Sequence, residues 1–150
     1  MSRWKSALIV FVVLSVAGAA AMTLDYTDTY VAGRFHKALA SERYELDTPF
    51  SLDSFLEYYD FDDVCVVTND GPHPELRTQF GLPFKHHQID EETWCLLFVK
   101  SYYVIAEIHV KRAILEPPSS LERNRFKRWQ AIVEIVDDGS GGKRLEFVGE

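Results

Sequence analysis

The segment Thr93–Lys100 (TWCLLFVK), Ser101 and Tyr102–Arg112 (YYVIAEIHVKR) decides the fold of this chain. Both halves are rich in the β-branched and aromatic residues that strands favour. In the second half apolar and polar residues alternate with period two, which is typical of a half-buried strand. We therefore predict a β-hairpin that turns around Ser101 and Tyr102. Its second strand has an apolar face of Val104, Ala106, Ile108 and Val110 and a more polar face of Tyr103, Ile105, Glu107, His109 and Lys111.

Three further regions of the chain indicate strands. Phe61–Thr68 (FDDVCVVT) has four contiguous apolar residues and predicts a buried strand. Trp129–Val136 alternates again, Asp137–Gly142 has the composition of a flexible turn, and Lys143–Val148 predicts the last strand. The chain therefore encodes a mainly antiparallel sheet of four to five strands.

Short helices are predicted before and between these strands. Asp28–Glu42 places apolar residues at helical spacing, and Ser51 can cap a helix at Leu52–Tyr59. Pro74 is suited to the first position of another helix that Gly81 ends, and Leu121–Lys127 reads as a short basic helix. The fold class is therefore α+β, with two or three short helices on one face of the sheet.

The N-terminal segment, residues 1–22, has the pattern of a signal peptide or signal anchor. Arg3 and Lys5 precede an unbroken apolar run from Ala7 to Met22, which ends in small residues that include an A-x-A cleavage pattern. Cleavage would release a soluble exported protein, and retention would leave it anchored in the cytoplasmic membrane. In both cases residues 23–150 form a single globular domain on the outer, periplasmic or extracytoplasmic, side.

The charge of the chain restricts its partners. Formal net charge is −7 at pH 7, and removal of the N-terminal segment with Arg3 and Lys5 makes it more negative. Nucleic-acid binding is excluded as a general function, because it relies on Lys and Arg that neutralise phosphates. The acidic surface favours a basic protein partner instead.

Two cysteines, Cys65 and Cys95, lie inside predicted strands. In an exported protein such a pair is a disulfide candidate. The alternative is two buried thiols that act as small apolar side chains.

The sequence predicts no metal site, no cofactor and no catalytic residue. His73, His86 and His87 lack a metal-ligand spacing, and adjacent histidines on an extended chain point in opposite directions. Asp60, Asp62 and Asp63 precede a strand, where a solvated or capping role is common. An alternative hypothesis is an enzyme with a noncanonical site built from His86, His87 and the carboxylates of residues 60–63.

One basic patch stands out on the acidic domain. Such a cluster can bind an anionic membrane surface or an acidic partner, or it can be a solvated face paired with carboxylates. Its members are Lys111, Arg112, Arg123, Arg125, Lys127 and Arg128.

Around Phe61–Val66 the sequence resembles a set of small exported bacterial proteins of uncharacterised activity. Shared features are an aromatic-Asp-x-Val strand, a helix that ends at Phe80-Gly81, and the strand motif Leu96–Val99. The similarity covers roughly residues 50–110. Many of those proteins carry a lipid-attachment cysteine after the signal, which this sequence lacks. The resemblance implies an exported α+β domain and no particular activity.

These observations predict a non-enzymatic, exported or membrane-anchored binding domain with an unknown protein partner. A toxin neutralised in the manner of an immunity protein is one such partner. A second alternative is a structural subunit of a membrane complex, in which residues 7–22 form a transmembrane helix and small residues pack against partners.

Overall fold

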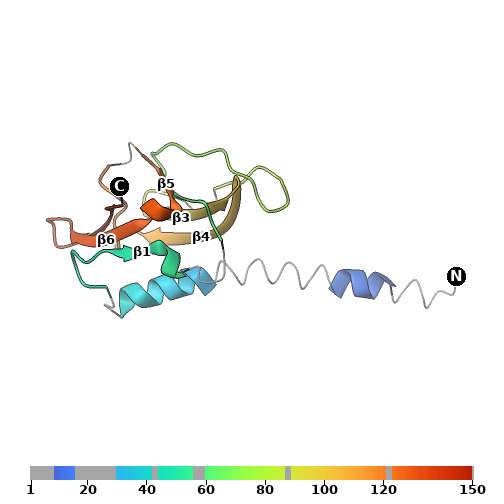
Figure 1. Ribbon diagram of the computed structural model, residues 1–150, viewed down its shortest axis with the longest axis horizontal. Coiled ribbons are helices and arrows are strands. Elements are labelled where there is room, and N and C mark those ends of the chain that lie inside the picture. Colours follow the sequence, from blue (N-terminus) through green and yellow to red (C-terminus); the bar gives the residue numbers. More distant parts are fainter. Residues whose placement is uncertain are drawn as a thin grey trace.

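The computed structural model describes residues 9–15, 30–41, 44–55, 60–86, 89–120 and 123–149. Within these ranges it has two α-helices, residues 9–15 and 30–40, and two antiparallel sheets, which confirms an α+β fold (Figure 1). The signal or anchor predicted at residues 1–22 lies mostly outside the described residues. No helix in the described ranges combines the length and the apolar content needed to cross a membrane.

The larger sheet has four strands: β2 (Asp63–Val67), β3 (Thr93–Lys100), β4 (Tyr103–Lys111) and β5 (Arg125–Lys127). Their order is β4-β3-β2-β5, and every pair is antiparallel. The predicted hairpin is confirmed, with Ser101 and Tyr102 between β3 and β4. The basic helix predicted at residues 121–127 is wrong, because its last three residues are extended and pair with β2 as β5.

A β-bulge shifts the register of the hairpin. Val99 lies opposite Val104, but Phe98 lies opposite Ala106, so Ile105 is an extra residue in β4. A bulge of this kind reverses the alternation of side chains along the strand. The prediction that Val104 shares a face with Ala106 is therefore wrong. Val104 packs on the opposite side of the sheet, together with Val99.

The smaller sheet has three strands: β1 (Phe50–Ser51), β6 (Ile132–Asp137) and β7 (Lys143–Phe147), in the order β1-β6-β7. β6 and β7 confirm the last two predicted strands, and they form a sheet of their own instead of extending the larger one. Two 3₁₀ helices, η1 (Leu52–Phe55) and η2 (Arg128–Gln130), follow β1 and β5. Ser51 caps η1, since its Oγ accepts a hydrogen bond from the backbone N–H of Asp53 at 3.2 Å.

One face of the four-stranded sheet, here the first face, is entirely apolar. The helix of residues 30–40 covers it with Val31, Phe35 and Ala38, and the three-stranded sheet completes this core. In Figure 1 that helix (cyan) lies along one side of β1 and β4. The first face consists of Val64, Val66, Trp94, Leu96, Phe98, Ala106, Ile108, Val110 and Phe126.

The other side of the same sheet, the second face, is covered by an irregular segment, residues 68–86 and 89–92. Leu76, Phe84 and Ile89 of that segment pack on the sheet. The helix predicted between Pro74 and Gly81 is wrong, because Arg77 forms β-bridges to Pro83 and Tyr103 instead. The second face consists of Asp63, Cys65, Val67, Cys95, Leu97, Val99, Glu107, His109, Arg125 and Lys127.

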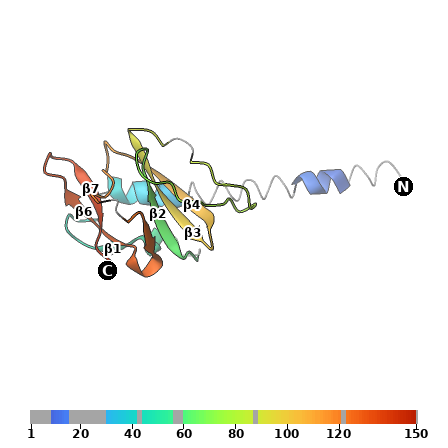
Figure 2. The ribbon, with the colours of Figure 1, turned by 90° about the horizontal axis from the view of Figure 1, so that it is seen from above.

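Figure 2 shows the same arrangement from above. The three-stranded sheet with β6 and β7 lies beside the four-stranded sheet, and the green and yellow segment between β2 and β3 runs along the far side of the latter. The two sheets and the helix therefore enclose the main core, while the segment covers a smaller second core.

Candidate functional site

An open cleft of about 540 Å³ lies where β2 begins and the hairpin turns. Its walls come from the residues before β2, the hairpin turn, β5 and η2. Three aspartates, three basic side chains and two exposed aromatic rings surround it. These residues are Asp60, Asp62, Asp63, Tyr102, Arg125, Lys127, Arg128 and Trp129.

Asp63 is the buried anion of this cleft, with its side chain only 3% exposed. Arg125 and Lys127 contact its two oxygens at 2.5 and 2.8 Å. Both cations reach it because they flank Phe126 on β5, directly beside β2. Burial by itself would raise the pKa of Asp63, but hydrogen bonds from Lys127 and Arg125 outweigh burial and lower it.

Asp60 and Arg128 form a second, more exposed ion-pair network. Asp60 accepts hydrogen bonds from Lys100 and Arg128, both at 2.6 Å, and Arg128 also donates to Asp53 at 2.8 Å. The hydrogen bond from Lys100 lowers the pKa of Asp60. The Arg128 guanidinium lies 4.9 Å from the centre of the Phe61 ring. Every cation named here therefore faces a carboxylate inside the cleft.

Two aromatic side chains at the rim of the cleft are exposed, Trp129 at 66% and Tyr102 at 63%. Tyr102 is held by its backbone. The turn residues Ser101 and Tyr102 both have positive φ, 47° and 72°, a conformation that non-glycine residues rarely adopt. Asp62 accepts a hydrogen bond from the N–H of Ser101, and Arg77 donates one to the carbonyl of Tyr102, both at 2.9 Å.

The structure does not bring the six predicted patch residues together. Arg125, Lys127 and Arg128 line the cleft, whereas Lys111 lies opposite Thr93 at the other end of the sheet. Arg112 pairs with Glu116 at 3.1 Å, and Arg123 donates a hydrogen bond to the Gln130 side chain at 2.8 Å. The described members other than Lys111 thus bond to carboxylate or amide oxygens of the same chain.

The histidines and aspartates of the enzyme hypothesis line two different clefts. His86 lies with its ring centre 4.6 Å from that of His73, in a cleft of about 640 Å³ that the segment covering the second face forms together with Tyr102. Asp60 and Asp63 line the ion-paired cleft, and Tyr102 borders both clefts. His87 lies outside the described residues.

The cysteines, both among the described residues, are not joined by a disulfide. Cys65 lies opposite Leu97 and Cys95 lies opposite Val67, so the two are diagonal neighbours on the second face. Diagonal neighbours in a sheet are about 7–8 Å apart, which is beyond the usual reach of a disulfide. Burial raises the pKa of the Cys65 thiol to about 11.

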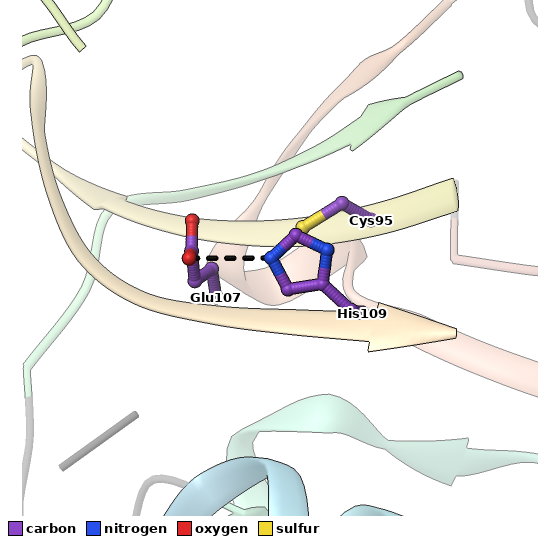
Figure 3. A group of neighbouring side chains, drawn as sticks. All are labelled: Cys95, Glu107 and His109. Atoms are coloured by element: carbon purple, nitrogen blue, oxygen red, sulfur yellow. Dashed lines mark hydrogen bonds and ion pairs between the residues drawn. The ribbon is translucent and has the colours of Figure 1, made fainter. Parts of the chain in front are cut away.

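Cys95 instead belongs to a cluster that the sequence did not predict, the Cys95–Glu107–His109 cluster (Figure 3). Its candidate ligand atoms all lie within 4.8 Å of one another, which makes it a group that can hold a metal ion. His109 Nε2 lies 3.2 Å from Glu107 Oε1. Alternation already puts Glu107 and His109 on one side of β4. The bulge at Ile105 then pairs His109 with Cys95, whereas an unbulged hairpin would place Ile108 there.

Comparison of the chain with family models, with curated proteins and with solved structures gave no match. The resemblance of residues 50–110 to exported bacterial proteins therefore stays a prediction.

Proposed function

We propose that this domain is a non-enzymatic binding module that recognises a basic protein through the rim of the ion-paired cleft. The observation that carries the proposal is the pair of exposed rings, Trp129 and Tyr102, beside a cleft whose charges are already paired. Trp, Tyr and Arg are the residue types that contribute most to binding energy in protein interfaces.

The internal ion pairs argue for a protein partner over a small charged ligand. A small anion would have to displace Asp63 from Arg125 and Lys127, or Asp60 from Lys100 and Arg128. The aromatic rings need no such exchange, because they are solvent-exposed and gain energy by burial alone. A partner surface with an apolar pocket suits them, and the net charge of −7 attracts one that is basic.

The strained turn supports the same surface. Positive φ at two consecutive non-glycine residues costs free energy, and such strain tends to persist where function requires it. Here the hydrogen bonds of Ser101 and Tyr102 hold the tyrosine ring in place, with Arg125 at 5.5 Å from its centre. A pre-positioned ring loses little entropy when a partner binds.

Export places the partner outside the cytoplasm in this proposal. The signal or anchor pattern of residues 1–22 supports that location, and a basic toxin neutralised by the domain is one partner of the required chemistry.

The test compares the full chain with Trp129→Ala in crosslinked pull-downs from envelope and exported fractions of its own cells. We expect a basic protein to be captured by the wild type and its affinity for Trp129→Ala to fall by about thirtyfold, the scale of an interface hot spot. Higher salt should slow its association, because steering by opposite charge is screened.

The matched control is Phe80→Ala, which removes a ring of 74% exposure outside the cleft and should leave binding unchanged. Equal affinity of the wild type and Trp129→Ala for the captured protein would refute the proposed surface.

A further inference from the structure

Three ligand-type side chains converge on the second face at adjoining positions of β3 and β4. Cys95 and His109 lie directly opposite each other in the register, and Glu107 is two residues before His109 on the same side of the strand. Figure 3 shows the Cys95 sulfur beside the His109 ring, with Glu107 on the other side of that ring. Strands position these side chains more rigidly than loops would.

The burial of the cluster separates two kinds of chemistry. A thiol with a neighbouring imidazole and carboxylate is also the arrangement of a cysteine nucleophile. Cys95, however, is only 1% exposed, so a substrate cannot approach its sulfur. A bound ion needs no such access. The ligand atoms of Cys95, Glu107 and His109 already lie within 4.8 Å of one another.

We propose that Cys95, Glu107 and His109 bind one Zn²⁺ ion. One thiolate, one carboxylate and one imidazole suit zinc, whereas the sulfur ligand disfavours Mg²⁺ and Ca²⁺. The charges also balance. A thiolate and a carboxylate cancel the two positive charges of the ion, so the bound site buries no net charge.

Binding releases one proton for each ion. Glu107 enters as a carboxylate and His109 as neutral imidazole, while the Cys95 thiol must lose its proton to solvent before it can ligate zinc. No electron transfer is involved. Three protein ligands leave one tetrahedral position for water or a partner group. Glu107 borders a cleft of about 220 Å³ between the hairpin and Phe84, so the cluster lies beside an opening through which an ion can enter.

The experiment is a titration of the metal-free full chain with Zn²⁺ and, separately, with Co²⁺. We expect one ion per chain and release of about one proton, obtained from calorimetry in buffers of different ionisation enthalpy. Cobalt should give a thiolate charge-transfer band. Cys95→Ala should abolish that band, and His109→Ala should weaken zinc binding by at least about a hundredfold.

Cys65→Ala is the matched control, since Cys65 is the other buried cysteine of the same face. This variant should leave the cobalt band intact. Glu107→Gln keeps the size of the side chain and tests the site if His109→Ala does not fold. Absence of stoichiometric binding, a cobalt band that survives in Cys95→Ala, or its loss in Cys65→Ala would each overturn the proposal.

Discussion

The two faces of the four-stranded sheet are built from the same strands but carry different side chains. The first face contains only apolar residues and is covered by a regular helix and a second sheet. The second face has an apolar centre, with polar residues on its two outer strands and at the start of β2, and an irregular segment as its cover. At one side Arg125 and Lys127 pair with Asp63, and at the other Glu107 and His109 meet Cys95.

This difference indicates a division of labour within one sheet. Regular, closely packed cover excludes polar groups, because each buried one needs a partner. On the second face the charged side chains of Asp63, Arg125 and Lys127 lie at an open cleft, where they contact one another. The first face therefore carries the larger apolar core, and the second face holds the paired charges beside the cleft and the Cys95–Glu107–His109 cluster.

The strongest test compares two phenylalanines that cover the two faces. Phe35 is fully buried against the first face, and Phe84 is partly buried against the second. We expect Phe35→Ala to lower the free energy of unfolding by about 4 kcal/mol and Phe84→Ala by about 1–2 kcal/mol, because less area and a smaller cavity are involved. Urea denaturation of the three proteins measures both values. Equal losses would mean that the second face is as stabilising as the first.

The sequence predicts the first face better than the second for a physical reason. Alternation identified β4, and contiguous apolar residues identified β2, because burial imposes a periodic pattern on regular elements. The bulge at Ile105 left no such pattern, so Val104 was assigned to the wrong side. The helix expected at residues 74–81 failed because Arg77 pairs with the edge of β4, a contact distant in sequence.

The candidate sites show the same limit. Asp60, Asp63, Arg125 and Arg128 were each singled out from the sequence, but as separate acidic and basic groups. Their pairing depends on β5. The basic composition of residues 121–127 had led to the prediction of a helix there instead of this strand. Trp129, at the rim, was assigned to the start of the predicted strand 129–136, but it lies in η2 and β6 begins only at Ile132. Nothing in the alternation indicated that its ring would be exposed beside a cleft.

A smaller effect is expected at Asp63, the buried anion of the second face. Asp63→Asn should lower the free energy of unfolding by about 2 kcal/mol at neutral pH, because the charge-assisted hydrogen bond from Arg125 and the ion pair with Lys127 are weakened.

The effect of pH on Asp63 follows from its lowered pKa. A carboxyl with a folded-state pKa below its ordinary value of 3.8 stabilises the fold above that value, and the stabilisation is lost as pH falls below it. The difference between wild type and Asp63→Asn, measured by denaturation across acidic pH, should therefore shrink below pH 3.8. A difference that stays constant would show that the asparagine acts through packing and not through charge.

The smallest expected effect concerns the hairpin turn, which joins β3 to β4 at the edge of both faces. Replacement of Ser101–Tyr102 by Asn-Gly should raise the free energy of unfolding by about 1 kcal/mol, because these residues accept positive φ readily. The same change should weaken binding of the protein partner. Thermal denaturation and affinity are measured on the same samples, with Tyr102→Ala as the control that removes the ring but keeps the strain. A more stable Asn-Gly variant with unchanged affinity would show that neither the Tyr102 ring nor the strained turn contributes to binding.

The outer edge of β4 has a consequence for self-association. A nine-residue edge strand exposes a row of unsatisfied backbone groups on which other chains can assemble into aggregates. Here Arg77 pairs with the start of the edge, Ile105 bulges next to it, and His36 Nε2 lies 2.9 Å from the carbonyl of His109 further along. Because of these three interruptions, the described part of this edge offers no long regular strand for another chain to pair with. The irregular segment and the helix therefore disfavour fibrillar growth as well as covering the sheet.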